Sequence, residues 1–175
     1  MEGILISRWS FFQFITVLLL ICSMFIADLF KKNVTTPMEL NQVGLPIPAY
    51  VTMLFIVAIV GCFYLITIFQ FKKDPGILSH RIWEKMHIIT ILIFTASLLI
   101  FVTLIVVTPL DEWIQKWRGL LYLIMIYFFF LIYWFMLSIV NKYIATTMSK
   151  INKIHVSFAG TAFLLIVIIF FLPSI

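Results

Sequence analysis

The sequence predicts an all-α protein, a polytopic membrane bundle of about five transmembrane helices with a cytoplasmic N-terminus. Of its 175 residues, 64% are hydrophobic and only 11% charged, whereas roughly 25% of the residues in a soluble domain are charged. The apolar residues form continuous runs of about the 20 residues that a helix needs to cross a hydrocarbon core of about 30 Å. The Lys and Arg residues between the runs are unequally divided, which indicates an orientation in the membrane.

The predicted spans cover residues 9–30, 48–71, 87–107, 119–140 and 156–175. Their uninterrupted apolar character argues against a membrane barrel, whose strands alternate apolar and polar residues over about 10 positions. If the last run does not cross, four spans remain. With no linker and no internal repeat, we expect residues 1–175 to form a single transmembrane domain.

The loops on one side of the predicted membrane carry eight of the twelve Lys and Arg residues. These are Arg8, Lys72, Lys73, Arg81, Lys85, Lys142, Lys150 and Lys153. By the positive-inside rule this side faces the cytoplasm. The first run lacks a small-residue cleavage site, so we expect a retained span rather than a signal peptide. The abundance of Ile, Phe, Lys and Asn fits an AT-rich bacterial gene, and hence a multi-pass protein of the bacterial cytoplasmic membrane.

The sequence predicts different structures for two of the inner loops. Asp74-Pro75-Gly76 predicts a tight turn, since proline fixes φ and glycine permits positive φ. Residues 142–155 are expected to be an interfacial connector, with continuation of the fourth helix as the alternative. Tryptophan is common at the level of the lipid headgroups because its indole ring is amphipathic. Four tryptophans near the ends of the predicted spans are therefore expected to be interfacial anchors: Trp9, Trp83, Trp113 and Trp117.

The predicted spans contain almost no charge. Asp28 is the one acid within a span, and Lys31 and Lys32 follow it at helical spacing, which predicts a local ion pair near the outer surface. A charge-free interior argues against a proton-coupled transporter, because buried charge in a membrane normally serves a function.

Histidines offer one cofactor alternative. His87 and His155 begin neighbouring spans at matched depth, as haem-binding histidines do. Interfacial histidine is the commoner case, however, and we expect no bound cofactor and no metal site. Cys22 and Cys62 lie at unequal depths and are expected to be unpaired packing residues.

No hydrolase or metalloprotease motif is present, so we expect a protein that is not an enzyme. Small residues within the spans, among them Gly61, Ala96 and Gly160, predict close helix packing, either inside the monomer or between copies.

By size and hydropathy the chain is similar to several unrelated groups of small bacterial membrane proteins, including superinfection-exclusion proteins, colicin-immunity proteins and the membrane subunit of Kiwa-type phage defence. No residue motif selects among them. The favoured hypothesis is a non-enzymatic membrane subunit that forms homo-oligomers or docks a cytosolic protein through the inner cations from Lys72 to Lys153, with no direct nucleic-acid binding. A small oligomeric channel and a haem- or quinone-linked redox protein are the alternatives.

Overall fold

The computed structural model is a bundle of five long helices. It describes residues 8–34, 47–108, 113–114, 116, 119–144 and 148–171, and side chains over 8–26, 53–108, 113–114, 116, 119–144 and 148–168. The helices are α1 (Arg8–Val34), α2 (Ile47–Lys73), α3 (Ile82–Val107), α5 (Gly119–Tyr143) and α6 (Lys150–Phe171). A short 3-10 helix, η1 (Ile77–Ser79), connects α2 to α3. Within the described ranges every regular element is helical, which confirms the predicted all-α fold.

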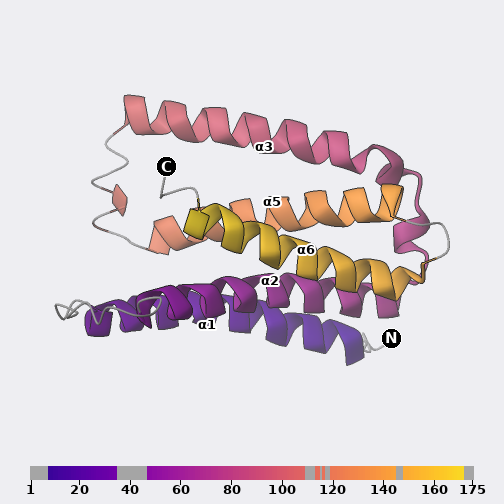
Figure 1. Cartoon of the computed structure of the whole chain (residues 1–175), viewed down its shortest axis with the longest axis horizontal. Helices are drawn as coiled ribbons and strands as arrows, with labels where there is room; N and C mark the ends of the chain where they lie inside the picture. The colour runs from indigo at the N-terminus through magenta and orange to yellow at the C-terminus, as the bar shows by residue number, and fades with distance from the viewer. Residues whose placement is uncertain are drawn as a thin grey trace, which may run out of the picture.

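All five helices are long and apolar enough to cross a membrane. The shortest, α6, has 22 residues, which at about 1.5 Å per residue span about 33 Å, slightly more than a hydrocarbon core of about 30 Å. The chain is therefore a multi-pass membrane protein. The helices alternate in direction, so α1, α3 and α6 begin at the same end of the bundle at which α2 and α5 finish (Figure 1).

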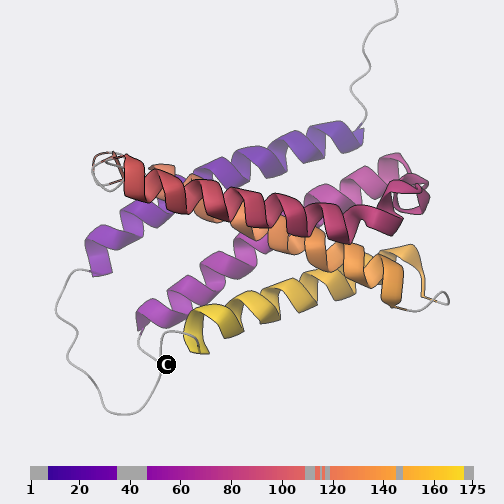
Figure 2. The same cartoon turned by 90° about the horizontal axis from the view of Figure 1, so that it is seen from above.

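The core of the bundle lies where α2, α5 and α6 meet. Ile59 and Val60 of α2, Tyr133 of α5, and Ile154 and Leu165 of α6 are all 0–1% exposed. The other two helices are peripheral: α1 packs mainly on α2, and α3 packs chiefly on α5. Figure 2 shows α3 crossing over α5 on one side of the bundle, with α6 and α1 on opposite flanks. One whole side of α3 is consequently left to contact lipid.

Two helix starts differ from the predicted spans. The third helix begins at Ile82, five residues before the predicted His87, and the last begins at Lys150, six residues before Val156. The second difference has a local cause, because the Ser149 hydroxyl accepts a hydrogen bond of 3.2 Å from the Asn152 backbone N–H, as an N-cap does. Much of the segment expected to be an interfacial connector is thus the first two turns of α6.

The turn after α2 brings the chain back toward the bundle. α2 ends at Lys73, two residues before Pro75, as expected because the residue before a proline is disfavoured in helix. The Asp74 carboxylate accepts a 2.9 Å hydrogen bond from the Gly76 N–H. Gly76 itself has φ −80° and ψ −17°, so the turn depends on Pro75 and the Asp74 bond and makes no use of a positive φ at glycine.

Candidate functional site

All eight cations assigned to the inner side lie at one end of the bundle, which we call the cationic end. It comprises the starts of α1, α3 and α6, the finishes of α2 and α5, and the connection through η1 (Figure 1). Asp74 and Glu84 are the acids among the described residues at this end. Counted over the described residues, eight positive and two negative side chains leave a net formal charge of +6 there.

Two lysines of α6 hold neighbouring segments together. Lys150 Nζ donates to the Pro75 carbonyl at 3.1 Å and to the Ser79 hydroxyl. Lys153 Nζ donates to the Asn141 backbone carbonyl at 3.1 Å. The Asn141 amide in turn donates to the Leu78 carbonyl at 3.0 Å. These bonds connect α6, the finish of α5 and η1, so Lys150 and Lys153 have structural tasks.

Three further lysines also have partners inside the protein. Lys72 Nζ lies 4.6 Å from the centre of the Trp9 ring, within the range of a cation–π contact. Lys73 Nζ donates to the Ser10 hydroxyl at a long 3.3 Å. Lys142 Nζ lies 3.0 Å from His87 Nε2, and the ammonium must be the donor because lysine has no acceptor.

Arg81 and Lys85 differ from these lysines. Both side chains are exposed, at the start of α3. Among the hydrogen bonds found within the described residues, none involves either side chain. Of the expected docking residues, these two are therefore the most available to a partner outside the bundle.

The two candidate haem histidines have separate environments. His87 on α3 contacts Lys142 of α5, and its Nδ1 is buried with no partner among the described residues. His155 on α6 shares a 2.8 Å hydrogen bond with the Tyr64 hydroxyl of α2 through its Nδ1. α3 and α6 do not pack closely against each other. Each imidazole is thus bonded to a different helix, and the structure does not bring the two rings together.

The remaining expected residues have varied positions. Trp9 stacks on Phe69 with ring centres 6.0 Å apart, and Trp113 is 55% exposed. Trp83 is 9% exposed and therefore packs inside the bundle rather than facing the headgroups. Trp117 and the side chains of Asp28, Lys31 and Lys32 lie outside the described residues. Cys22 is exposed, Cys62 is buried, and both are free.

Close helix approach occurs at one of the three small residues. A Cβ built on Gly160 would lie 2.8 Å from Met136 Cε of α5, so Gly160 allows α6 to approach α5 closely. A Cβ on Gly61 would meet nothing within 4 Å. Ala96 is exposed on α3. Among the described residues, no group of three His, Cys, Asp or Glu side chains is arranged to hold a metal ion.

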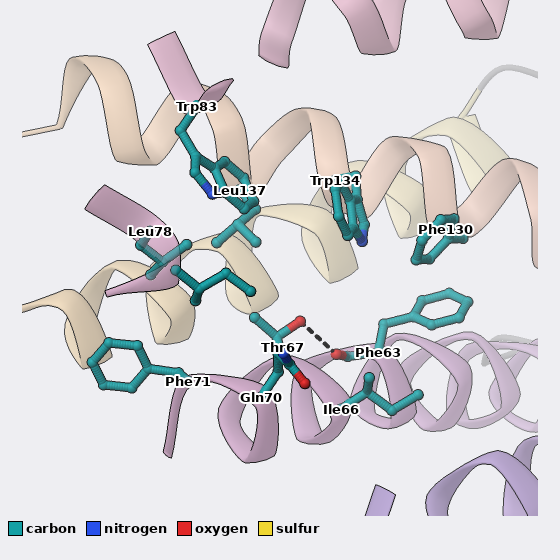
Figure 3. Close-up of a pocket in the computed structure, with 11 residues that line it drawn as sticks. Phe63, Ile66, Thr67, Gln70, Phe71, Leu78, Trp83, Phe130, Trp134 and Leu137 are labelled. Atoms are coloured by element: carbon teal, nitrogen blue, oxygen red, sulfur yellow. Dashed lines mark hydrogen bonds between the residues drawn. The ribbon is translucent and has the colours of Figure 1, made fainter. Parts of the chain in front are cut away.

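A cavity of about 220 Å³ lies between α2 and α5, beside the cationic end (Figure 3). Its walls are mostly aromatic and aliphatic, and they include Phe63 of α2, Leu78 of η1, Trp83 of α3, and Phe130 and Trp134 of α5. Trp83 stacks on Trp134, with ring centres 5.6 Å apart. The burial of Trp83 is thus explained by its place in this wall.

Two polar side chains of α2, Thr67 and Gln70, also line the cavity. The Thr67 hydroxyl donates to the Phe63 carbonyl at 2.8 Å. Gln70 accepts a 2.9 Å hydrogen bond from the Gln13 amide of α1. The sequence analysis did not single out the cavity. The signal available to it was the pair Gln13 and Gln70, two isolated amides inside apolar runs near the same predicted surface.

No protein-family model, no curated protein and no solved structure matches the chain. The cationic end and the cavity are therefore the features of this protein that indicate its function.

Proposed function

We propose that the protein is a non-enzymatic subunit of a bacterial membrane complex that docks an acidic cytosolic protein on its cationic end. The supporting observation is the availability of Arg81 and Lys85. Both are exposed at the first turns of α3, whereas the lysines at 72, 73, 142, 150 and 153 have partners within the bundle.

The placement of α3 supports the same proposal. α3 packs chiefly on α5. At its start Trp83 is buried, whereas Arg81 and Lys85 are exposed, where a partner protein has access. Ile82, 56% exposed, lies directly beside Arg81 and adds an apolar contact to the charged ones. Interfaces combine an apolar centre with charged residues that steer association and fix orientation. The setting we propose is immunity, exclusion or phage defence, by similarity of size and hydropathy alone.

Photo-crosslinking in living cells tests this proposal. A photoreactive amino acid in place of Ile82 is expected to capture one soluble protein. Arg81→Gln together with Lys85→Gln is expected to reduce that capture, by as much as about thirtyfold if each exposed charge contributes up to about 1 kcal/mol. The matched control is Lys116→Gln, which neutralises an exposed cation at the opposite end of the bundle and should leave capture unchanged.

Three outcomes contradict the proposal. One is capture of lipid alone from position 82. Another is capture of the same soluble protein in equal yield after both cations are neutralised. The third is an equal loss of capture with the Lys116→Gln control, because the effect would then not be specific to the cationic end.

A further inference from the structure

The cavity between α2 and α5 is lined almost wholly by apolar side chains, and the amide of Gln70 lies on its side toward the cationic end. Phe63 and Phe130 line it farthest from that end, and Gln70 lies seven residues beyond Phe63 along α2. Seven residues correspond to about 10 Å of helix, a large part of the roughly 15 Å that make up half of a hydrocarbon core. The cavity therefore extends from near the membrane surface deep into one leaflet, with its amide group at the shallow end.

Cations lie just beyond the shallow end. Lys73 follows Gln70 by three residues, so it lies one turn nearer the surface on the same side of α2. Within the part of the chain that the structure describes, Lys73 makes a single long bond, to Ser10, which uses one of its three N–H donors. Arg81 lies in the chain between two wall residues, Leu78 and Trp83. Along the membrane normal, the apolar cavity is thus followed by the Gln70 amide and then by the positive charges of Lys73 and Arg81.

The size of the cavity limits what it can hold. An engineered cavity of about 150 Å³ binds one benzene, which by proportion gives roughly nine carbon atoms for a cavity of this size. Drug-sized ligands occupy sites of roughly 300–1,000 Å³, and a haem or a quinone with its tail is at least as large. A stretch of a single hydrocarbon chain fits.

Among the described side chains, the walls of the cavity come from α2, η1, α3 and α5, with no lining residue from α1 or α6. In Figure 3, where parts of the chain in front are cut away, α6 lies behind the cavity, and the labelled side chains of α2 and α5 face one another across it.

We propose that this cavity is a binding site for an anionic phospholipid of the leaflet at the cationic end. One acyl chain enters between α2 and α5 and packs on Phe63, Phe130 and Trp134. The amide N–H groups of Gln70, whose oxygen accepts from Gln13, donate to the ester region, and Lys73 and Arg81 bind the phosphate. The order of apolar, amide and cationic groups matches the order of chain, ester and phosphate in a phospholipid.

Lipid photo-labelling of the full-length protein in vesicles tests this inference. The probes are phosphatidylglycerol and phosphatidylcholine, each with a diazirine on one acyl chain, and the labelled peptides are mapped by mass spectrometry. With phosphatidylglycerol, labelling is expected to concentrate on residues 63–71 and 130–137. It should exceed phosphatidylcholine labelling there by about fivefold for each cation that reaches the phosphate.

Two substitutions separate the chain from the headgroup. Ile66→Trp fills the cavity, which Ile66 lines, and is expected to abolish labelling at 63–71 and 130–137. Its matched control is Leu99→Trp, which adds the same ring to a side chain 61% exposed on α3 and should leave the labelling unchanged. Lys73→Gln should remove about fivefold of the preference for phosphatidylglycerol. Lys85→Gln, at the proposed docking surface, should not change that preference.

Even labelling over the lipid-facing side chains of α1 and α3, with no enrichment at the cavity, overturns the inference. Equal labelling of the cavity by the two lipids overturns it as well, since the cations then contribute nothing. Both measurements use the unaltered protein, so they decide the matter even if Ile66→Trp does not fold. If the lipid-labelling test fails, capture of a soluble protein at position 82 is unaffected. If that capture fails, lipid labelling of the cavity is likewise unaffected.

Discussion

Removal of the Asn141 side chain is expected to destabilise the cationic end by a calculable amount. Asn141→Ala deletes the 3.0 Å bond to the Leu78 carbonyl. A net hydrogen bond contributes about 0.5–1.5 kcal/mol, and an acceptor left buried and unpaired costs about 1–3 kcal/mol. Leu78 is 5% exposed, so water reaches its carbonyl poorly. The expected loss of unfolding free energy is about 1–2 kcal/mol.

Lys153→Met tests the other bond at the same residue. Methionine keeps the apolar stem and removes the ammonium, which donates to the Asn141 carbonyl at 3.1 Å and to its side-chain oxygen at 3.5 Å. Charge-assisted bonds contribute about 1.5–3 kcal/mol. Because Lys153 is only half-buried, the lower part of that range is expected.

The two substitutions should be nearly additive. The shorter bond of Lys153 goes to the backbone carbonyl of residue 141, which Asn141→Ala retains. The coupling energy in a double-mutant cycle should therefore stay within about 0.5 kcal/mol, although contacting residues often couple by 0.5–3 kcal/mol. Reversible unfolding in mixed micelles supplies the four free energies. Asn152→Ala, at an exposed residue of α6, is the control. A coupling above about 1 kcal/mol, or an Asn141→Ala loss no larger than that of Asn152→Ala, would refute the reasoning.

Three further predictions concern helix packing. Gly160→Ala should cost little, because the Cβ meets only the mobile end of Met136, whereas Gly160→Leu should cost about 1–3 kcal/mol through overpacking. Gly61→Ala should stabilise α2 by up to about 1 kcal/mol, since glycine is a poor helix former and the space is open. The unfolding free energies are measured in the same micelles. A loss of stability in Gly61→Ala as large as that in Gly160→Leu would contradict this prediction. Tyr127→Phe removes the 2.6 Å bond between the Tyr127 and Ser97 hydroxyls and should cost about 0.6 kcal/mol, the mean for such bonds between membrane helices; no measurable loss would mean that the bond does not connect α3 to α5.

Sequence patterns identified the five helices and the end at which the cations gather. Both are properties of single segments: a run of apolar residues must be helical in lipid because every backbone polar group needs a partner. The starts of α3 and α6 were placed less well. The residues from Ile82 to Met86 and from Lys150 to His155 are polar enough to resemble loops, yet they continue helices beyond the hydrocarbon core.

The functional details depended on contacts between segments, which a single sequence does not encode locally. Lys150 and Lys85 are equivalent as loop cations and both are exposed. Lys150 donates to Pro75 and Ser79, whereas no hydrogen bond found within the described residues involves the Lys85 side chain. Trp83 resembled a headgroup anchor because it lies near charged residues, yet it stacks on Trp134, more than fifty residues away in the chain. Only the packing of α3 on α5 shows that Trp83 lies in the bundle and is not an anchor at the headgroups.

Some cations bond within the bundle and others do not, and this difference links the fold to the proposed functions. Lysines that bond to carbonyls and hydroxyls within the bundle fix the positions of η1, α5 and α6, and η1 contributes Leu78 to the cavity wall. The same bonds therefore shape the cavity, and none of them involves Arg81 or Lys85 at the start of α3. A partner that binds Arg81 would contact the residue that we also place at the lipid phosphate. Partner and lipid would then compete for one guanidinium, so docking should weaken as the fraction of anionic lipid rises, and it should weaken less in the Arg81→Gln variant.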